Sequence, residues 1–278
     1  MLTVSIVVHK TPEHQLRKAL ECLNISDLYK IYVIDNSPTD DLRSVCTSDK
    51  IEYLHVENKG FGAGHNIAIK KSIDLGSHYH LVMNADVWWE GDVLKDLSLY
   101  LDKNPDVGLV APKVFYPDGE LQYTCRMLPT PSDLIFKRFL PEKVNKKRMM
   151  NYLLERHDHD FALNSPYLLG SFLLFRTEAL KREGIFDERY FMYPEDIDIT
   201  RRLHRNWKTI YWPGVSIVHE HQAASRKNRK MLKIHIINMV KYFNKWGWWK
   251  DKERENFNKI LLDSIVKLSP GKIQKGRG

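Results

Sequence analysis

Short apolar runs rich in Val and Ile alternate with amphipathic stretches over the first third of the chain. Four such runs are typical of buried strands and lie at 3–8, 30–37, 51–58 and 78–86. Between the first two, apolar residues from Leu16 to Leu23 recur at helical spacing after Pro12, and Gly76 ends a second helical stretch. Strands and helices that alternate at such short intervals predict an α/β fold with a mostly parallel, doubly wound sheet.

The rhythm changes after Asp86. The pattern predicts a helix at 92–105, a strand and turn at 108–122, a strand followed by a helix at 165–180, and a late strand at 207–221. Residues 129–163 are rich in Pro, Lys, Arg and His, which indicates an irregular or helical insertion.

Composition sets wide limits on this picture. The 278 residues are 43% hydrophobic and 28% charged, which is typical of a soluble globular protein and excludes disordered and fibrous classes. Cys22, Cys46 and Cys125 are odd in number and contain no CxxC pair, so neither a disulfide framework nor a cysteine metal site is expected. The most apolar segment, 167–175, spans nine residues, and we expect neither an export signal nor a membrane span.

Positive charge is concentrated near the carboxyl terminus. The net charge is +8, and residues 220–278 carry fifteen Lys or Arg against five Asp or Glu. Nucleic-acid binding would place basic residues around the chemical core rather than in a tail, so no nucleic-acid partner is expected. Membrane lipid headgroups are the favoured partner of this basic region.

Polar residues end several of the predicted strands. Asp35 and Asp86 each follow an apolar run, Asn84 lies two residues before Asp86, and the late strand ends in His219 and His221. A ligand at the carboxyl edge of a parallel sheet would meet such residues. Asp35 could accept hydrogen bonds from a base or ribose, and Asp86 with His219 could hold a divalent cation. An Asx turn at Asp35 and a helix cap at Asp86 stay open as structural alternatives.

The segment NKGFGAGHN places glycines at 60, 62 and 64 just before a predicted helix. Backbone amides exposed in such a loop can meet phosphate oxygens. The segment matches neither GxGxxG nor a Walker loop, so a plain loop is an equal alternative.

The most unusual stretch is YFMYPEDIDITRRLHRNW (190–207). Three acids, Glu195, Asp196 and Asp198, come just before three arginines, Arg201, Arg202 and Arg205. Acids at the start of a helix can simply offset its dipole. An acid in that position can equally act as a general base, and Arg202 can neutralise phosphate. We favour the functional interpretation of this stretch.

Seven motifs in chain order carry a family resemblance: SIVV, IDNSPTD, ENKGFGAGHN, NADV, LLGSFLLFRTEAL, FDERYFMYPEDIDITRRL and VHEHQAAS. They resemble the GT-A glycosyltransferases, and most of all the bacterial family-two enzymes of the rhamnosyltransferase-like group, which build O-antigen and other surface polysaccharides. The resemblance implies a GT-A (Rossmann-like) mixed, mostly parallel sheet flanked by helices, and an inverting displacement. It implies a catalytic domain at 1–225, with nucleotide-binding and acceptor-binding parts at about 1–110 and 111–225, and leaves 226–278 as a basic helical region.

The resemblance also implies roles for single residues. Asp35 would contact the nucleoside base, together with backbone near Val8 and His9. The nucleotide pocket would be shaped by Asn58, Gly60, Gly64 and Asn66. Arg202 aligns with the family's arginine after EDxD and joins the donor-binding set.

Catalytic and metal-binding roles follow in the same way. Asp196 would be the base that removes the proton of the acceptor hydroxyl, and Glu195 would orient the acceptor or the base. Asp86 matches the last acid of the family's DxD motif, whose first acid is Asn84 here, a replacement that the rhamnosyltransferase-like group also shows. The divalent cation, Mn²⁺ or Mg²⁺, would therefore rely on Asp86, the diphosphate and His219.

The resemblance favours dTDP-rhamnose as the donor, leaves UDP-linked hexoses open, and implies a saccharide or lipid-linked saccharide acceptor. One alternative is a noncatalytic nucleotide- or carbohydrate-binding subunit of the same fold, which Asn84 in place of an acid would suit. Another is a sugar-phosphate nucleotidyltransferase, although such enzymes usually carry a glycine-rich loop after the first strand and SIVVHKTPEHQ has no glycine there.

The basic region contains an amphipathic pattern. Apolar residues repeat at spacings of four and three on one predicted helix face, formed by Leu232, Ile236, Met239, Phe243 and Trp246. Lysines on the other faces and two further tryptophans suit an anionic membrane surface, whereas a helix docked on the catalytic domain is an equal alternative. We therefore expect a cytoplasmic protein that is peripheral on the inner face of the plasma membrane.

Overall fold

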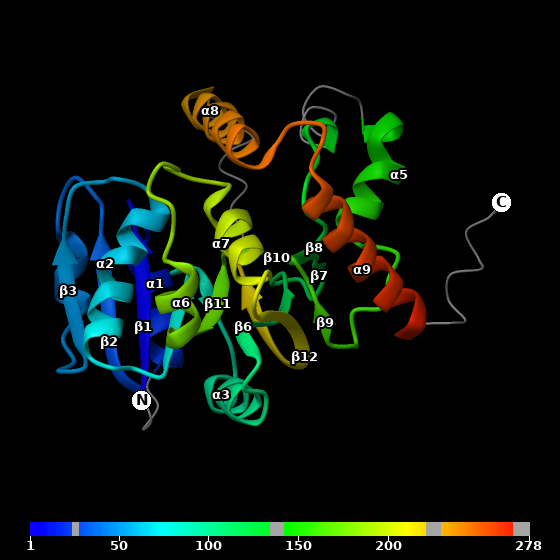
Figure 1. Cartoon of the computed structure of the whole chain (residues 1–278). Coiled ribbons are helices and arrows are strands. Elements are labelled where there is room, and N and C mark those ends of the chain that lie inside the picture. The colour runs from blue at the N-terminus through cyan, green and yellow to red at the C-terminus, as the bar shows by residue number, and fades with distance from the viewer. Residues whose placement is uncertain (24–27, 134–141, 221–228, 269–278) are drawn as a thin grey trace.

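The computed structural model describes residues 1–23, 28–133, 142–220 and 229–268 (Figure 1). The strands are β1 (Leu2–Val8), β2 (Leu28–Asp35), β3 (Ile51–His55), β4 (Tyr79–Met83), β5 (Val87–Trp88), β6 (Val107–Phe115), β7 (Leu121–Gln122), β8 (Cys125–Arg126), β9 (Leu163–Asn164), β10 (Tyr167–Leu168), β11 (Phe172–Arg176) and β12 (Lys208–His219). The helices are α1 (Glu13–Cys22), the 3₁₀ helix η1 (Asp41–Val45), α2 (Phe61–Asp74), α3 (Val93–Lys103), α5 (Glu142–Tyr152), α6 (Thr177–Glu183), α7 (Glu195–Leu203), α8 (Arg229–Trp246) and α9 (Lys252–Leu268).

The main sheet is mixed, as predicted. Its strand order is β3-β2-β1-β4-β11-β6-β12-β5, with β7 paired to β6 and β9 to β12. The strands β1 to β4 run parallel, as do β6 and β12, whereas β11 is antiparallel to both of its neighbours. The parallel strands end at one edge, which brings residues after β1, β2 and β4 together.

Helices cover both faces of this sheet. One face carries α1 and α3, whose Leu16 and Leu97 join the larger apolar core cluster. The other face carries α2, α6 and α7, and there Ile69 and Ile199 share a second cluster with strand residues. Strands that are buried on both faces explain the nearly continuous apolar runs in the sequence.

The carboxyl-terminal helices pack against α7 and the sheet. Met239 and Phe243 of α8 share an apolar cluster with Ile197 of α7, and Leu261 of α9 joins the cluster on the sheet. The carboxyl-terminal helix is therefore docked on the rest of the chain, which is one of the two alternatives left open by the sequence. The expected apolar face is wrong in part, because the Ile236 side chain is 48% exposed. The domain boundary at residue 225 stays a prediction.

The stretch predicted as an insertion contains α5, so its helical interpretation is confirmed for 142–152, while 134–141 lie outside the described residues. In Figure 1, α5 and α9 appear together on the side of the molecule opposite β3. None of the helices in the described part of the chain combines the length and apolar character needed to cross a membrane.

Candidate functional site

The carboxyl ends of β1 and β2 bring the predicted base-binding residues together. Val8 pairs with Asp35 in register. His9 follows directly, and its imidazole Nδ1 donates a hydrogen bond to the Asn36 carbonyl oxygen at 2.8 Å. The Asn58 amide Nδ2 lies 3.3 Å from the same His9 nitrogen. Residues far apart in sequence therefore form one polar edge beside β1.

The Asp35 carboxylate is buried and already engaged by neighbouring groups. Its Oδ1 accepts a hydrogen bond from the Ser37 amide at 2.7 Å, which is the Asx turn left open by the sequence. Its Oδ2 accepts a hydrogen bond from the Tyr53 hydroxyl. This hydrogen bond and burial raise the pKa of Tyr53 above its ordinary value, so the phenol keeps its proton. Base contact by Asp35 stays a prediction, with Tyr53 as an added neighbour.

Gly60 joins α2 to the segment that precedes α7. Its φ is +104°, and a Cβ built on it would lie 2.2 Å from the Phe191 carbonyl oxygen. The next amide, that of Phe61, donates a hydrogen bond to this oxygen at 3.0 Å. The glycine therefore serves close packing of two backbone segments, and its predicted contact with the donor nucleotide is untested.

We expect Gly60→Ala to lower the free energy of unfolding by about 2–4 kcal/mol, because alanine adds strain at positive φ and a clash with backbone. Urea denaturation would measure the loss. The matched control is Gly76→Ala, at φ +67° with no atom within 4 Å of the added Cβ, which should cost only about 1 kcal/mol. Equal losses in the two variants would contradict the close contact at Gly60.

Gly64 and Asn66 also have packing roles. A Cβ on Gly64 would lie 2.9 Å from Val7, so glycine lets α2 approach β1. The buried Asn66 amide donates hydrogen bonds to the Phe186 carbonyl oxygen and to Glu188, both at 2.9 Å, and accepts one from the Phe186 amide. These residues shape the walls of the nucleotide edge, and direct donor contacts by them stay predictions.

The predicted metal ligands converge where β4 ends. Pairing of β12 with β5 sets His219 opposite Val87, so its imidazole lies beside the preceding residue, Asp86. His219 Nε2 is 3.4 Å from Asp86 Oδ1 and 3.4 Å from the Asn84 amide Nδ2. A carboxylate oxygen and an imidazole nitrogen are donors that Mn²⁺ accepts. No cluster of three or more His, Cys, Asp or Glu suited to a metal is present in the described ranges.

Gln122 of β7 orients the imidazole of His219. Its side-chain amide donates to the His219 carbonyl oxygen at 2.7 Å, and its Oε1 lies 2.9 Å from His219 Nδ1. Because Oε1 can only accept, Nδ1 carries a proton, and in the neutral imidazole Nε2 then holds the lone pair. This is the tautomer that a metal-binding histidine needs, with the second ring nitrogen held by a partner.

The acid pair opens α7 and is buried. Asp196 Oδ2 accepts a hydrogen bond from the Gly170 amide at 3.0 Å, and its Oδ1 accepts one from its neighbour Ile197 at 2.7 Å. A Cβ on Gly170 would come within 3.1 Å of the Asp196 Cβ, so a larger residue would push the carboxylate away. Glu195 is 4% exposed, and its Oε2 has no hydrogen-bond partner within the described part of the chain.

Burial shifts the titration of both acids upward. It raises the pKa of Asp196 to about 6, although hydrogen bonds from the Gly170 and Ile197 amides and the charge of Arg126 oppose the rise. Burial and the adjacent charge of Asp196 raise the pKa of Glu195 well above its usual value. Asp196 therefore gives up its proton more readily than Glu195, an order that suits a base and a hydrogen-bond donor.

The loop between β10 and β11 connects the two sets of residues. Gly170 contacts Asp196. The carbonyl oxygen of the next residue, Ser171, accepts a hydrogen bond from the backbone N–H of Asn84 at 3.0 Å. Among the described residues, the Ser171 hydroxyl and Glu195 Oε2 are both buried without a hydrogen-bond partner. Unpaired buried polar atoms are costly, so two of them on this path mark a place that a polar ligand would fill.

The structure gives Arg202 a packing role. Its guanidinium donates to Asp198 Oδ2 at 2.9 Å and to the carbonyl oxygens of Glu183, Gly184 and Ile185 at 2.6, 3.0 and 2.7 Å. These bonds engage the whole guanidinium group with α7 and the turn after α6. Phosphate binding by Arg202 is untested, and the hydrogen bonds favour a structural role for it instead.

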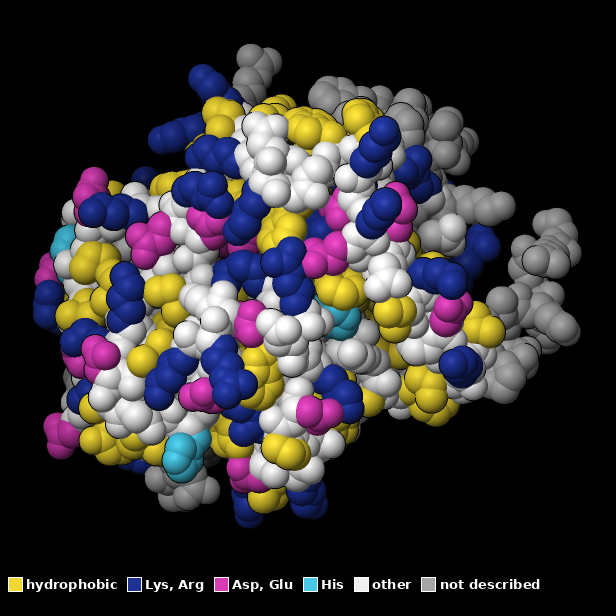
Figure 2. Space-filling model, in the orientation of Figure 1, with side chains coloured by type: hydrophobic (Ala, Val, Ile, Leu, Met, Phe, Trp, Pro, Cys, Tyr) yellow, Lys and Arg dark blue, Asp and Glu magenta, His cyan; other side chains and the backbone are white. Residues whose placement is uncertain are grey.

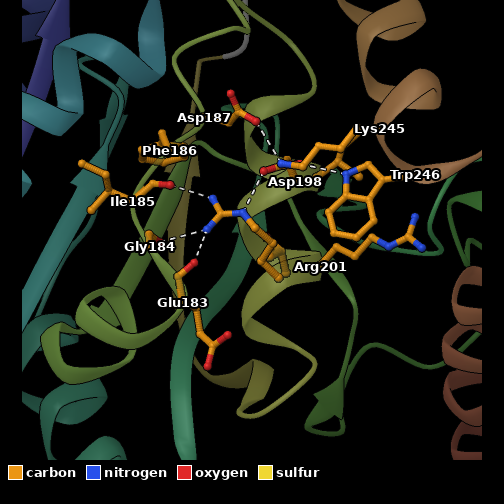
Figure 3. Close-up of polar contacts among 12 residues, drawn as sticks. Glu183, Gly184, Ile185, Phe186, Asp187, Asp198, Arg201, Lys245 and Trp246 are labelled. Atoms are coloured by element: carbon orange, nitrogen blue, oxygen red, sulfur yellow. Dashed lines mark hydrogen bonds and ion pairs between the residues drawn. The ribbon is translucent and has the colours of Figure 1, made fainter.

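Contacts with the carboxyl-terminal helices hold α7 in place. Figure 3 shows Asp198 between two residues of α8: Lys245 Nζ lies 2.6 Å and Trp246 Nε1 2.8 Å from its Oδ1. Arg201, three residues after Asp198 on α7, is 1% exposed and donates to both Asp251 oxygens at 2.8 and 2.6 Å. Its Nε donates to Glu253 at 2.8 Å. The helix that begins with the acid pair is thus tied to α8 and α9.

Comparison with known proteins decides the family. Residues 3–184, well over half of the chain, match Glycosyl transferase family 2. The chain belongs to this family. It is 25% identical over 268 residues to the N-acetylglucosaminyl-diphospho-decaprenol L-rhamnosyltransferase of Mycobacterium tuberculosis, covering 88% of this chain and 85% of that protein. It is 28% identical over 250 residues to rhamnosyltransferase WbbL of Escherichia coli, covering 85% and 90% of the two proteins.

Solved structures confirm the GT-A fold of this family-two glycosyltransferase. The mannosyltransferase PcManGT from Pyrobaculum calidifontis, solved with GDP-Man and Mn²⁺, gives a TM-score of 0.60 at 18% identity, over 95% of this chain and 69% of that one. GalNAc-T7, solved with UDP, GalNAc and Mn²⁺, gives 0.61 at 14% identity, over 97% and 58%. At these identities the likeness shows the fold alone.

Sequence reasoning missed three residues of this candidate site. Gln122 lies in a two-residue strand after a PDG turn, and the turn was the only signal near it. Arg126 and Gly170 lie near Asp196 only through the pairing of β8 with β10, Arg126 with Tyr167. That short pairing leaves no periodic pattern in the sequence. His221 lies outside the described residues.

Proposed function

We propose that this family-two enzyme is an inverting glycosyltransferase that moves rhamnose from dTDP-rhamnose to a saccharide or lipid-linked saccharide acceptor of a bacterial surface polysaccharide. The observation that carries the proposal is the buried acid pair of Glu195 and Asp196. It is linked through the Gly170–Ser171 loop to the edge that holds Asp86 and His219. The names of two relatives, both rhamnosyltransferases, support the choice of sugar.

The chemistry follows from these positions. The acceptor oxygen attacks the anomeric carbon, the bond from that carbon to the diphosphate oxygen breaks, and Asp196 takes the acceptor proton. Inversion results because attack and departure occur on opposite faces. A protonated Glu195 donates a hydrogen bond that orients the acceptor. A divalent cation, Mn²⁺ or Mg²⁺, supplies positive charge for the departing diphosphate, and Asp86 with His219 would hold it.

The polar edge beside β1 takes the nucleoside. Asp35, His9 and Asn58 offer hydrogen-bond donors and acceptors to a base and its ribose, and the walls are formed around Gly60 and Asn66. A UDP-linked hexose is the alternative donor. Two solved structures of similar fold hold GDP-Man and UDP, which supports a nucleotide-linked donor.

The acceptor is proposed to be lipid-linked, with the enzyme peripheral on the cytoplasmic face of the plasma membrane. A relative that matches 88% of this chain is named for a decaprenol-linked substrate. The basic region 220–278 supplies the charge for contact with anionic lipid.

Thermal stabilisation by nucleotide-sugars tests the donor and the metal together. We expect dTDP-rhamnose with Mn²⁺ to raise the melting temperature more than UDP-glucose with Mn²⁺, and either sugar alone to have a smaller effect. Ligand at 100 times its dissociation constant adds about 2.7 kcal/mol to the free energy of unfolding. Asp86→Asn should remove the Mn²⁺-dependent part.

Asp92→Asn is the matched control, because Asp92 is an exposed acid six residues further along the chain. It should respond to donor and Mn²⁺ as the unmodified protein does. Stabilisation by UDP-glucose that exceeds that by dTDP-rhamnose would replace the proposed donor. Stabilisation that is indifferent to Mn²⁺ would remove the metal from the proposal.

A further inference from the structure

The outward face of α8 carries exposed apolar side chains that belong to none of the apolar core clusters of the described residues. Ile236, Ile237 and Val240 are 48%, 44% and 40% exposed and lie within one third of the helix circumference. Lys233 and Lys230 are exposed on the same arc. An exposed helix face of a soluble protein normally carries charged and polar residues instead, so this arc calls for a partner.

The opposite face of α8 holds the segment that leads into the acid pair. Asn238 donates a hydrogen bond to the Met192 carbonyl oxygen at 3.0 Å, and Lys241 Nζ donates to the Arg189 carbonyl oxygen at 2.7 Å. The His235 ring lies 4.6 Å from that of Tyr193, whose φ of +93° is a strained conformation for a tyrosine. One helix therefore presents an outward apolar face and an inward face that contacts the active-site segment.

Charge identifies the partner of the outward face. The helix RKMLKIHIINMVKYFNKW contains five Lys or Arg and no Asp or Glu. Trp249, in the turn after α8, is 68% exposed and lies next to Lys250. Isoleucine, valine and tryptophan beside lysines are the combination found at membrane interfaces. Figure 2 shows hydrophobic and basic side chains together along the upper edge of the molecule, over α8.

We propose that the arc formed by Lys230, Lys233, Ile236, Ile237 and Val240 is the docking surface for an anionic lipid bilayer. This docking surface deepens the proposed function and rests on it, because membrane contact serves an enzyme whose acceptor is lipid-linked. The apolar side chains insert among the acyl chains and the lysines meet the headgroup phosphates. Because the other face of α8 contacts residues 189–193, docking holds the acid pair near the bilayer, where a lipid-linked acceptor lies.

Vesicle sedimentation tests this surface with the full chain. We expect binding to vesicles of phosphatidylcholine and phosphatidylglycerol, and little binding to phosphatidylcholine alone. The triple variant Ile236→Ser, Ile237→Ser, Val240→Ser should bind at least about tenfold more weakly, because less apolar area enters the lipid. Lys233→Gln should weaken binding about fivefold and reduce its sensitivity to salt.

The matched control is the pair Ile260→Ser and Val266→Ser on α9, where both side chains are about equally exposed, at 52% and 51%. This variant should sediment as the unmodified protein does. Full binding by the triple variant, or no binding by the unmodified protein, would overturn the proposal. So would a dimer in solution that the triple variant dissolves, because the arc would then join two copies of the chain.

Donor-induced thermal stabilisation needs no vesicles, and this separates the two proposals. Donor stabilisation without lipid binding would remove the docking surface and leave the enzyme assignment intact. Lipid binding without donor stabilisation would remove the enzyme assignment and leave the docking surface intact.

Discussion

Replacing Asp196 with Asn should lower turnover by about 10²- to 10⁴-fold, which is the usual contribution of a positioned general base. The asparagine keeps the size of the side chain and can still accept the hydrogen bond from the Gly170 amide, but it cannot take the acceptor proton. The loss should therefore appear in kcat while the dissociation constant of the donor changes little. Release of the nucleotide diphosphate in the presence of acceptor would measure it.

The pH profile supplies a second readout of the same residue. Because Asp196 must be ionised to act and burial raises its pKa to about 6, kcat/KM should rise with pH through about 6 and level off above it. The variant should lose this rise. Asp263→Asn, at an exposed acid of α9, is the control and should keep both rate and profile. Near-normal turnover in Asp196→Asn would show that another group is the base.

Replacing Arg201 with Met should lower the free energy of unfolding by about 3–5 kcal/mol. The guanidinium is buried against Asp251, whose side chain is 3% exposed, and its loss leaves that carboxylate without its main partner. Urea denaturation would measure the change. Arg201 lies on α7, the helix that begins with the acid pair, so its loss should also displace that pair. The variant should therefore lose activity even at temperatures where it is still folded.

Arg205→Met is the matched control for this loss. Arg205 shares Glu253 with Arg201, at 2.6 Å, but its side chain is 46% exposed. Solvent-exposed ion pairs contribute only about 0–1 kcal/mol, so this variant should remain close to the unmodified protein. A similar small loss in Arg201→Met would mean that α9 does not hold α7 in the way the contacts indicate.

These contacts tie the carboxyl-terminal helices to the helix that carries the acid pair. Lys245 and Trp246 of α8 bind Asp198, and Asp251 and Glu253 bind Arg201, so both ties end on the helix that begins with Glu195. A truncation after residue 225 would therefore expose apolar surface on α7 and disturb the acid pair. Lipid binding is better tested with point variants on the outward face of α8.

The site was predictable from the sequence where it depends on strand ends. Asp35 and Asp86 follow apolar runs, and the carboxyl ends of parallel strands meet at one edge whatever the details of packing. His219 belongs to this group, because its strand pairs with β5 directly after Asp86. The residues that form hydrogen bonds with the side chains of the site were not predictable. Gln122 and Gly170 reach His219 and Asp196 through strands of two residues or a loop, which have no periodicity.

The orientation of side chains on helices was the other limit. Arg202 follows the acid pair at a spacing that suits phosphate binding, yet its guanidinium turns to backbone carbonyl oxygens around Gly184. On α8 the apolar residues cover more than one face. Tyr242 is buried and Ile236 is exposed because the rest of the chain packs against only one of these faces. Each residue turns a helix by about 100°, so the inward face depends on the partner surface.

The sequence by itself determined the order of strands and helices, the strand-end acids and the family, because these follow from local apolar periodicity and from motifs in chain order. Only the tertiary structure decided that Gln122 sets the tautomer of His219, that Gly170 admits Asp196, and that α8 holds the catalytic segment with one face while exposing the other. Such contacts join residues 26 to 97 positions apart, and their energies depend on distances that no local pattern encodes.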